Sequence, residues 1–206
     1  MRAFMNGGGS GKKTEAACKR FNEVIDHTKP ILYIPIALDP SWYPGCMDFI
    51  TKELAGVQVP NIHMETDANI IAKSDLDAYS AIFIGGGNTF RLLKELKESG
   101  AFDALAGYLK RDGIIFGGSA GAIILGASVE VAGFEDENEV GLSDFEGFDV
   151  LSGISLFCHY KGSEESKQYI RELSEKMPVH VLTEDTTLFL NGDKLEIIGE
   201  GYYTEV

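Results

Sequence analysis

The residues best suited to chemistry lie in residues 117–121, Gly-Gly-Ser-Ala-Gly, where Ser119 stands between small neighbours. The apolar residues 114–116 before it predict a buried parallel strand, and the apolar residues 122–125 after it predict a helix. A Gly-x-Ser-x-Gly pattern at such a turn is typical of a nucleophile elbow, which exposes the serine hydroxyl. The helix start would offer the N–H group of Ala120 to an oxyanion. The alternative is a glycine-rich turn that only packs closely or holds a phosphate.

A serine hydroxyl is a weak nucleophile, so the hypothesis needs a base, which is usually a histidine. The chain has four histidines, and three of them lie at an expected helix end or within strand patterns. His159 differs because it directly follows the apolar residues 154–158, at the end of an expected strand. We therefore expect His159 to reach the edge of the sheet where Ser119 lies, the alternative being a polar residue satisfied by its surroundings.

Alternating apolar runs and helical patterns predict the elements that would position these residues. Strands are expected at residues 1–5, 31–36, 59–64, 80–84 and 114–116, and helices at residues 12–26, 44–54, 90–96 and 101–110. This order predicts an α/β fold, with a mostly parallel central sheet flanked by helices on both faces. Sites in such sheets form at the carboxyl ends of strands, where both the elbow and the glycine-rich turn at residues 85–89 fall.

The pattern changes after the elbow. Short strands are expected at residues 128–131, 148–151, 154–158, 179–182, 187–190, 195–198 and 202–203, with a helix at residues 164–176. Asn-Gly-Asp at residues 191–193 predicts a C-terminal β-hairpin. With no repeat or linker visible, residues 1–206 are expected to form a single domain.

Composition excludes several classes of function. The 206 residues carry a net charge of −14, and basic residues occur in no run longer than a pair, which argues against a nucleic-acid or membrane partner. Three widely spaced cysteines fit no disulfide framework or zinc site and, with no leader or membrane segment in view, favour the cytoplasm. No cofactor or metal is expected. A phosphate loop at Gly11-Lys12 fails because Asn6 and Lys13 occupy its required glycine and hydroxyl positions.

Taken together, the Gly-Gly-Gly-Asn-Thr of residues 85–89, the serine elbow, the acidic loop and the Cys-His-Tyr of residues 158–160 resemble the peptidase E and cyanophycinase family of serine peptidases. The resemblance runs from residue 31 to the C-terminal hairpin. It implies a flavodoxin-like fold related to class I glutamine amidotransferases, hydrolysis of small peptides, and N-terminal aspartate as one substrate residue. It also implies Ser119 as nucleophile, His159 as base, and an oxyanion hole formed by Gly86, Gly87 and Ala120.

The family places an acidic residue between the serine and the histidine, and counting back from residues 147–149 puts Glu139 in that place, with Glu137 and Glu135 as alternatives. A carboxylate there would orient the imidazole. The alternative is that these acids are solvated. Ser119 and His159 would then work as a dyad, or with a carboxylate from elsewhere such as Glu184 or Asp185.

Two residues are expected to contact substrate by the same resemblance, Asn88 and Lys161. Lys167 and Arg171 are further basic candidates for holding a substrate aspartate, against a plain surface placement.

The sequence thus predicts a serine peptidase acting on small peptides through a Ser119-His159-Glu139 triad. A different serine acyl hydrolase, such as an esterase or amidase, or a non-catalytic binding protein on the same fold are the alternatives. The expected partner is a small peptide substrate, and a homodimer is one option for the oligomeric state.

Overall fold

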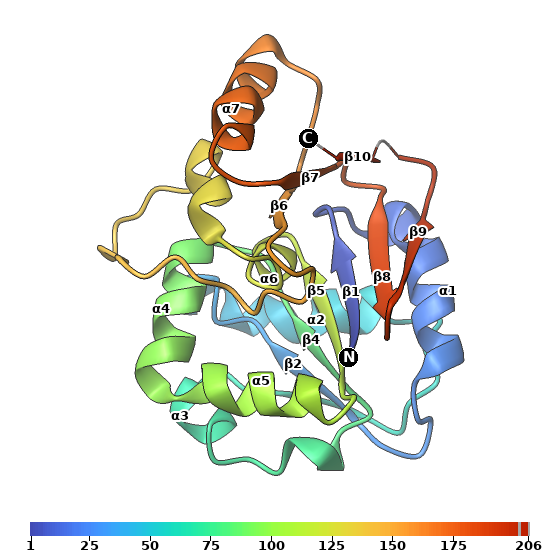
Figure 1. Ribbon diagram of the computed structural model, residues 1–206. Coiled ribbons are helices and arrows are strands. Elements are labelled where there is room, and N and C mark those ends of the chain that lie inside the picture. The colour runs from blue at the N-terminus through green and yellow to red at the C-terminus, as the bar shows by residue number, and fades with distance from the viewer. Residues whose placement is uncertain (202, 206) are drawn as a thin grey trace.

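A computed structural model describes residues 1–201 and 203–205. Its centre is a seven-stranded sheet in the order β3-β2-β4-β5-β1-β8-β9 (Figure 1). The five strands from β3 to β1 are parallel, and β8 and β9 continue the sheet antiparallel. The strands are β1 (Arg2–Asn6), β2 (Ile31–Ile34), β3 (Ile62–Met64), β4 (Ala81–Ile84), β5 (Ile114–Gly118), β8 (Thr187–Asn191) and β9 (Lys194–Ile198). The expected α/β fold with a mostly parallel sheet is confirmed.

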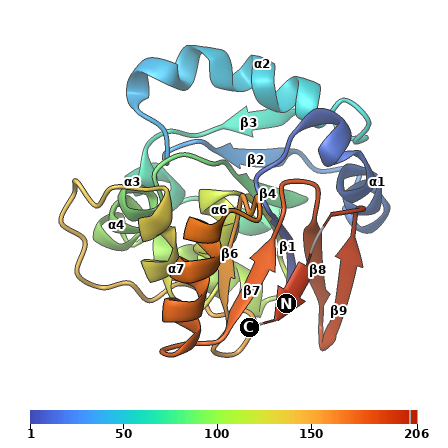
Figure 2. The same ribbon diagram turned by 90° about the horizontal axis from the view of Figure 1, so that it is seen from above.

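Helices cover both faces of this sheet, as predicted. The helices α1 and α2 pack on one face, while α3 to α6 pack on the other (Figure 2). The helices are α1 (Glu15–Val24), α2 (Tyr43–Glu53), α3 (Ala68–Ile71), α4 (Thr89–Ser99), α5 (Ala101–Lys110), α6 (Ala120–Ile123) and α7 (Glu164–Ser174). Within the described residues, no helix combines the length and the apolar character needed to cross a bilayer.

The core is built by strands whose side chains alternate between the two faces. A row of stacked phenyl rings crosses four neighbouring strands on the α1–α2 face, from Phe83 through Phe116 and Phe4 to Phe189. Adjacent rings stand on residues paired in register, with centroids 4.0–5.4 Å apart. This burial holds the strands in one register, so the loops at their carboxyl ends have fixed starting points.

A second sheet, absent from the sequence prediction, follows the elbow. It has the order β10-β7-β6, with β6 (Ser155–Phe157) parallel to β7 (Val179–Leu182) and β10 (Tyr203–Glu205) antiparallel. Tyr202, the other residue of the last expected strand, lies outside the described residues. Because β6 and β7 are parallel neighbours, the segments that follow them leave the same edge of this sheet.

Two expected strands around the acidic loop are wrong. Residues 129–134 form a 3-10 helix, with only an isolated bridge at Ser128. Residues 147–150 run past the end of α6, where the N–H groups of Phe148 and Val150 bond the carbonyl oxygens of Ile124 and Leu125. Apolar residues in this stretch therefore bury against α6 without a strand partner. The C-terminal hairpin β8–β9 is confirmed, with its two-residue turn after Asn191.

Candidate active site

Ser119 lies on a sharp strand-to-helix turn at the carboxyl end of β5. Ser119 has φ 52° and ψ −114°, a strained conformation for a residue with a side chain. A Cβ atom on Gly117 would lie 2.2 Å from the Gly121 carbonyl oxygen, and one on Gly121 would lie 2.2 Å from the Ile84 carbonyl oxygen. Both glycines of the pattern are thus required by close backbone approach, which holds the serine hydroxyl at the tip of the turn.

His159 meets this serine from the second sheet. It stands two residues after β6, and its Nε2 atom lies 2.7 Å from the Oγ atom of Ser119. Its backbone also has a left-handed φ of 55°, and its N–H group donates to the Gly7 carbonyl oxygen. The expectation that the strand end brings His159 to Ser119 agrees with this geometry.

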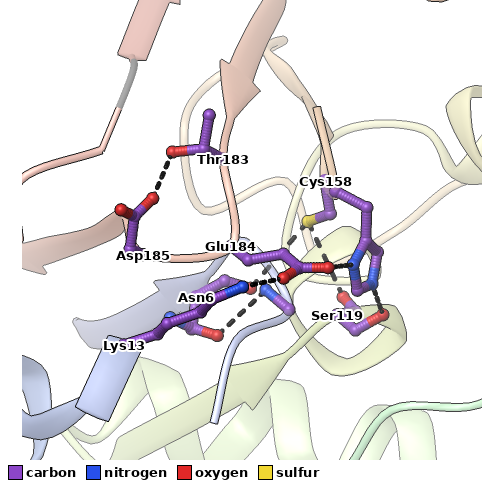
Figure 3. Close-up of polar contacts among 9 residues, drawn as sticks. Asn6, Lys13, Ser119, Cys158, Thr183, Glu184 and Asp185 are labelled. Atoms are coloured by element: carbon purple, nitrogen blue, oxygen red, sulfur yellow. Dashed lines mark hydrogen bonds and ion pairs between the residues drawn. The ribbon is translucent and has the colours of Figure 1, made fainter. Parts of the chain in front are cut away.

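The carboxylate at the other imidazole nitrogen is that of Glu184. Its Oε1 atom lies 3.2 Å from the Nδ1 atom of His159, and its Oε2 atom pairs with the Lys13 ammonium (Figure 3). The pKa of Glu184 lies below its ordinary value because Lys13, and then His159, donate hydrogen bonds to the ionised carboxylate. The carboxylate is therefore held ionised beside the imidazole.

The placement of Glu139 is corrected by this contact. Glu139, Glu137 and Glu135 are all exposed, and the loop that carries them is tied to the start of α4. There the Asn88 side chain donates to the Glu137 carbonyl oxygen, and an Asp136 carboxylate oxygen accepts the N–H of Thr89. The loop is thus bonded to the start of α4 and not to His159. Glu139 is exposed to solvent, which agrees with the alternative that these acids are solvated.

The expected substrate contacts take different places. Asn88 caps α4 by accepting the N–H of Arg91, while its amide donates to the acidic loop, so both ends of its side chain serve the protein. Asn88 therefore holds the start of α4 against the acidic loop, and its expected contact with substrate stays a prediction. Lys161 is exposed on the loop after His159.

The three residues expected to form an oxyanion hole lie around the nucleophile. A Cβ atom on Gly86 would lie 3.1 Å from the Cβ atom of Ser119, so the turn after β4 passes directly beside the serine. Gly87 has φ 136° and packs against the Ala37 carbonyl oxygen, and Ala120 follows the serine. Among the described residues, the N–H groups of Gly86, Gly87 and Ala120 donate no hydrogen bond within the chain.

The loop after β1 packs against His159 and Glu184. A Cβ atom on Gly8 would lie 2.1 Å from the His159 Cε1 atom, and one on Gly9 would lie 2.1 Å from the Glu184 carbonyl oxygen. The Gly8 N–H donates to the buried Asn6 side chain. Gly8 therefore places bare backbone directly against the imidazole, where a side chain would not fit.

Cys158 precedes the histidine but is not a competing nucleophile. It is 5% exposed, and its Sγ atom lies 4.0 Å from the Ser119 carbonyl oxygen. Burial raises the pKa of the Cys158 thiol far above its ordinary value, which keeps it protonated.

The sequence does contain a signal for Glu184, which is its position just after an apolar strand. Glu184 stands two residues after β7, as His159 stands two residues after β6, and those strands are parallel neighbours. The sequence contains no such signal for the Gly7–Gly9 loop or for Lys13. Their contacts with His159 and Glu184 join segments that are far apart in the sequence.

Comparison of the sequence with known proteins identifies a family of peptidases. The family model for peptidase family S51 matches residues 3–198. Peptidase E of Salmonella typhimurium (strain LT2) is 32% identical over 162 residues, covering 72% of this chain and 66% of the relative. Peptidase E of Shigella sonnei (strain Ss046) is 30% identical over 174 residues, covering 77% and 70%. The chain thus matches slightly less than two thirds of the Salmonella protein's length.

Two solved structures share the fold. A candidate peptidase E protein from Listeria monocytogenes EGD-e superposes with a TM-score of 0.77 at 20% identity, covering 97% of this chain and 98% of that one. A peptidase from an acI-B1 Actinobacterium gives a TM-score of 0.72 at 13% identity, covering 100% and 96%. The family is shown by the sequence: because the family model matches nearly the whole of it, the chain belongs to peptidase family S51.

Proposed function

We propose that this protein is a serine peptidase that hydrolyses small peptides, with Ser119 as nucleophile, His159 as general base and Glu184 as the carboxylate that orients the imidazole. The observation that carries the proposal is the continuous contact from Ser119 Oγ to His159 Nε2 and from His159 Nδ1 to Glu184 Oε1, at 2.7 and 3.2 Å. Family membership supports peptide bonds as the substrate class.

The chemistry follows from this order of contacts. Ser119 attacks the peptide carbonyl while His159 takes its proton, and the imidazolium then protonates the leaving amine. A water molecule releases the acyl group by the same route in reverse. The N–H groups of Ala120 and Gly86 are the donors we assign to the oxyanion, because they flank the serine and have no partner among the described residues.

A panel of dipeptides and simple esters, assayed with wild type and Ser119→Ala side by side, tests the proposal. Peptide hydrolysis by wild type and a loss of about a thousandfold or more in the variant are expected. Hydrolysis of esters alone would indicate a different acyl hydrolase. A folded wild-type protein that turns over neither class would contradict an enzymatic role.

The setting that we propose for this activity is the cytoplasm. The three cysteines are free and buried, as in a reducing compartment. Fractionation of the cells of origin with an antibody to the protein tests this placement, and recovery outside the cytoplasmic fraction would contradict it.

A further inference from the structure

A pocket beside the nucleophile is not used by the proposed triad. It has a volume of about 340 Å³ and is lined by Tyr33, Leu38, Trp42, Cys46, Phe49 and Gly86, and we call it the Trp42 pocket. Such a volume lies within the range of ordinary ligand pockets. Gly86 connects it to the site, because the same residue packs against Ser119.

The floor of the Trp42 pocket is uncharged. Tyr33 and Cys46 are buried, at 1% and 3% exposure, and burial raises the pKa of both groups, so each stays protonated. Among the described residues, no acidic or basic side chain lines the pocket. A carboxylate placed there would lose its hydration without meeting a cation, which is strongly unfavourable.

The walls of the pocket are aromatic and open to solvent. Trp42 is 68% exposed and Phe49 is 44% exposed, so both rings present apolar surface that nothing in the described chain covers. Trp42 lies in a short 3-10 helix (Pro40–Trp42) capped by Asp39, and its carbonyl oxygen accepts a contact from the Cys46 thiol. The two rings are therefore carried by anchored backbone, as a preformed pocket requires.

A second cavity, which Ser119 itself lines, offers much less room. This cavity, lined by residues that include His159, Phe134 and Phe157, has a volume of about 30 Å³, which suits a single water molecule. A large side chain next to the scissile carbonyl therefore fits in the Trp42 pocket and does not fit in this smaller cavity.

We propose that the Trp42 pocket binds a large apolar or aromatic side chain of the peptide, on the residue that supplies the scissile carbonyl. The inference rests on the proposed function, since it names the substrate class of that site. With the carbonyl oxygen at the Gly86 N–H, the side chain of the same residue is the nearest one to the pocket. This substrate class differs from the N-terminal aspartate implied by the resemblance, because the pocket carries no cation to hold an acidic side chain.

Dipeptides X-Ala, with X as Phe, Leu, Ala or Asp, test the proposal in hydrolysis. We expect kcat/KM for Phe-Ala and Leu-Ala to exceed that for Ala-Ala by about 10- to 100-fold, with Asp-Ala lowest. Gly45 also lines the pocket, and its missing Cβ points to open space, so Gly45→Leu fills the pocket without a backbone clash. This variant is expected to lose most of the preference for Phe-Ala over Ala-Ala.

Trp42→Ala and Phe49→Ala are expected to lower the ratio of kcat/KM for Phe-Ala to kcat/KM for Ala-Ala by about tenfold. Ile70→Ala is the matched control, because Ile70 is another exposed large apolar residue, at 50%, and does not line the pocket. A preference for Asp-Ala, equal rates across the panel, or an equal response of the Phe49 and Ile70 variants would overturn the proposal.

Binding without turnover separates this inference from the proposed function. Trp42 is the only tryptophan in the chain, so the fluorescence of Ser119→Ala reports directly on the pocket. Phe-Ala should change this emission in a saturable way, and Asp-Ala at the same concentration should not. A saturable change with no hydrolysis by wild type would support the pocket and contradict the peptidase. Hydrolysis with no change in emission would keep the peptidase and overturn the pocket.

Discussion

Replacing Glu184 with glutamine is expected to lower kcat by about 10² to 10³ while the protein stays folded. The carboxylate lies 3.2 Å from the imidazole nitrogen, and the two side chains are 29% and 22% exposed. Unit charges about 4 Å apart interact by about 1 kcal/mol in bulk water and about 4 kcal/mol at an effective dielectric constant near 20. Since each ~1.4 kcal/mol is a tenfold change in rate, the loss of charge alone costs about 5- to 1000-fold.

The amide adds a second effect, which places the expectation in the upper part of that range. Glutamine at position 184 can present N–H where the imidazole needs an acceptor, which favours the tautomer that cannot take the Ser119 proton. Lys13 loses its partner carboxylate in this variant, but its side chain is 53% exposed and water can solvate the ammonium. The free energy of unfolding should therefore change by less than about 1 kcal/mol.

The assay is steady-state hydrolysis of a turned-over dipeptide, with circular dichroism melting as the check on folding. Glu139→Gln is the matched control, because it neutralises an exposed glutamate that the sequence favours, and it is expected to be close to neutral. An active Glu184→Gln beside an impaired Glu139→Gln would refute the assignment of Glu184 and restore the sequence prediction.

Three further outcomes follow from the same contacts. Gly8→Ala should lower kcat by about 100-fold, because its Cβ atom meets the His159 ring, whereas Gly11→Ala, at a positive φ facing open space, should keep kcat. Lys13→Met should raise the pKa of Glu184 toward its ordinary value, as read by NMR titration of the side-chain carboxyl, because the hydrogen bond from Lys13 is the main cause that lowers it. Because the pKa of Glu184 lies below its ordinary 4.5, its stabilising contribution is present above pH 4.5 and is lost as pH falls through the lowered pKa. The melting temperature of wild type should therefore drop more steeply on acidification than that of Glu184→Gln, and parallel curves would contradict this.

The sequence predicted the parts of the fold that local patterns determine. Apolar runs of three or four residues followed by glycine predicted β4 and β5 and the turn at Ser119, because a buried strand and its turn are encoded by adjacent residues. The hairpin after Asn191 was predicted for the same reason. The apolar residues near Phe148 were interpreted as a strand, although their N–H groups bond the end of α6, because a short apolar run does not show which partner it buries against.

Site residues could be predicted where each follows its own strand in the sequence, but not where two strands must pair to bring them together. His159 was found because it ends an apolar run. Glu184 was named only as an alternative to Glu139, because the acid was placed by counting along the chain and the pairing of β6 with β7 was not predicted. The contact of Gly8 with the imidazole joins residues about 150 positions apart, and no local pattern encodes it.

Labelling with a fluorophosphonate, followed by mass spectrometry of the modified peptide, tests whether Ser119 is an activated nucleophile and requires no knowledge of the substrate. We predict one label per folded chain, on Ser119, absent in Ser119→Ala and slowed by at least about 100-fold in His159→Ala. A folded wild-type protein that takes no label, or takes it at another serine, would contradict the assignment of Ser119 as a nucleophile activated by His159.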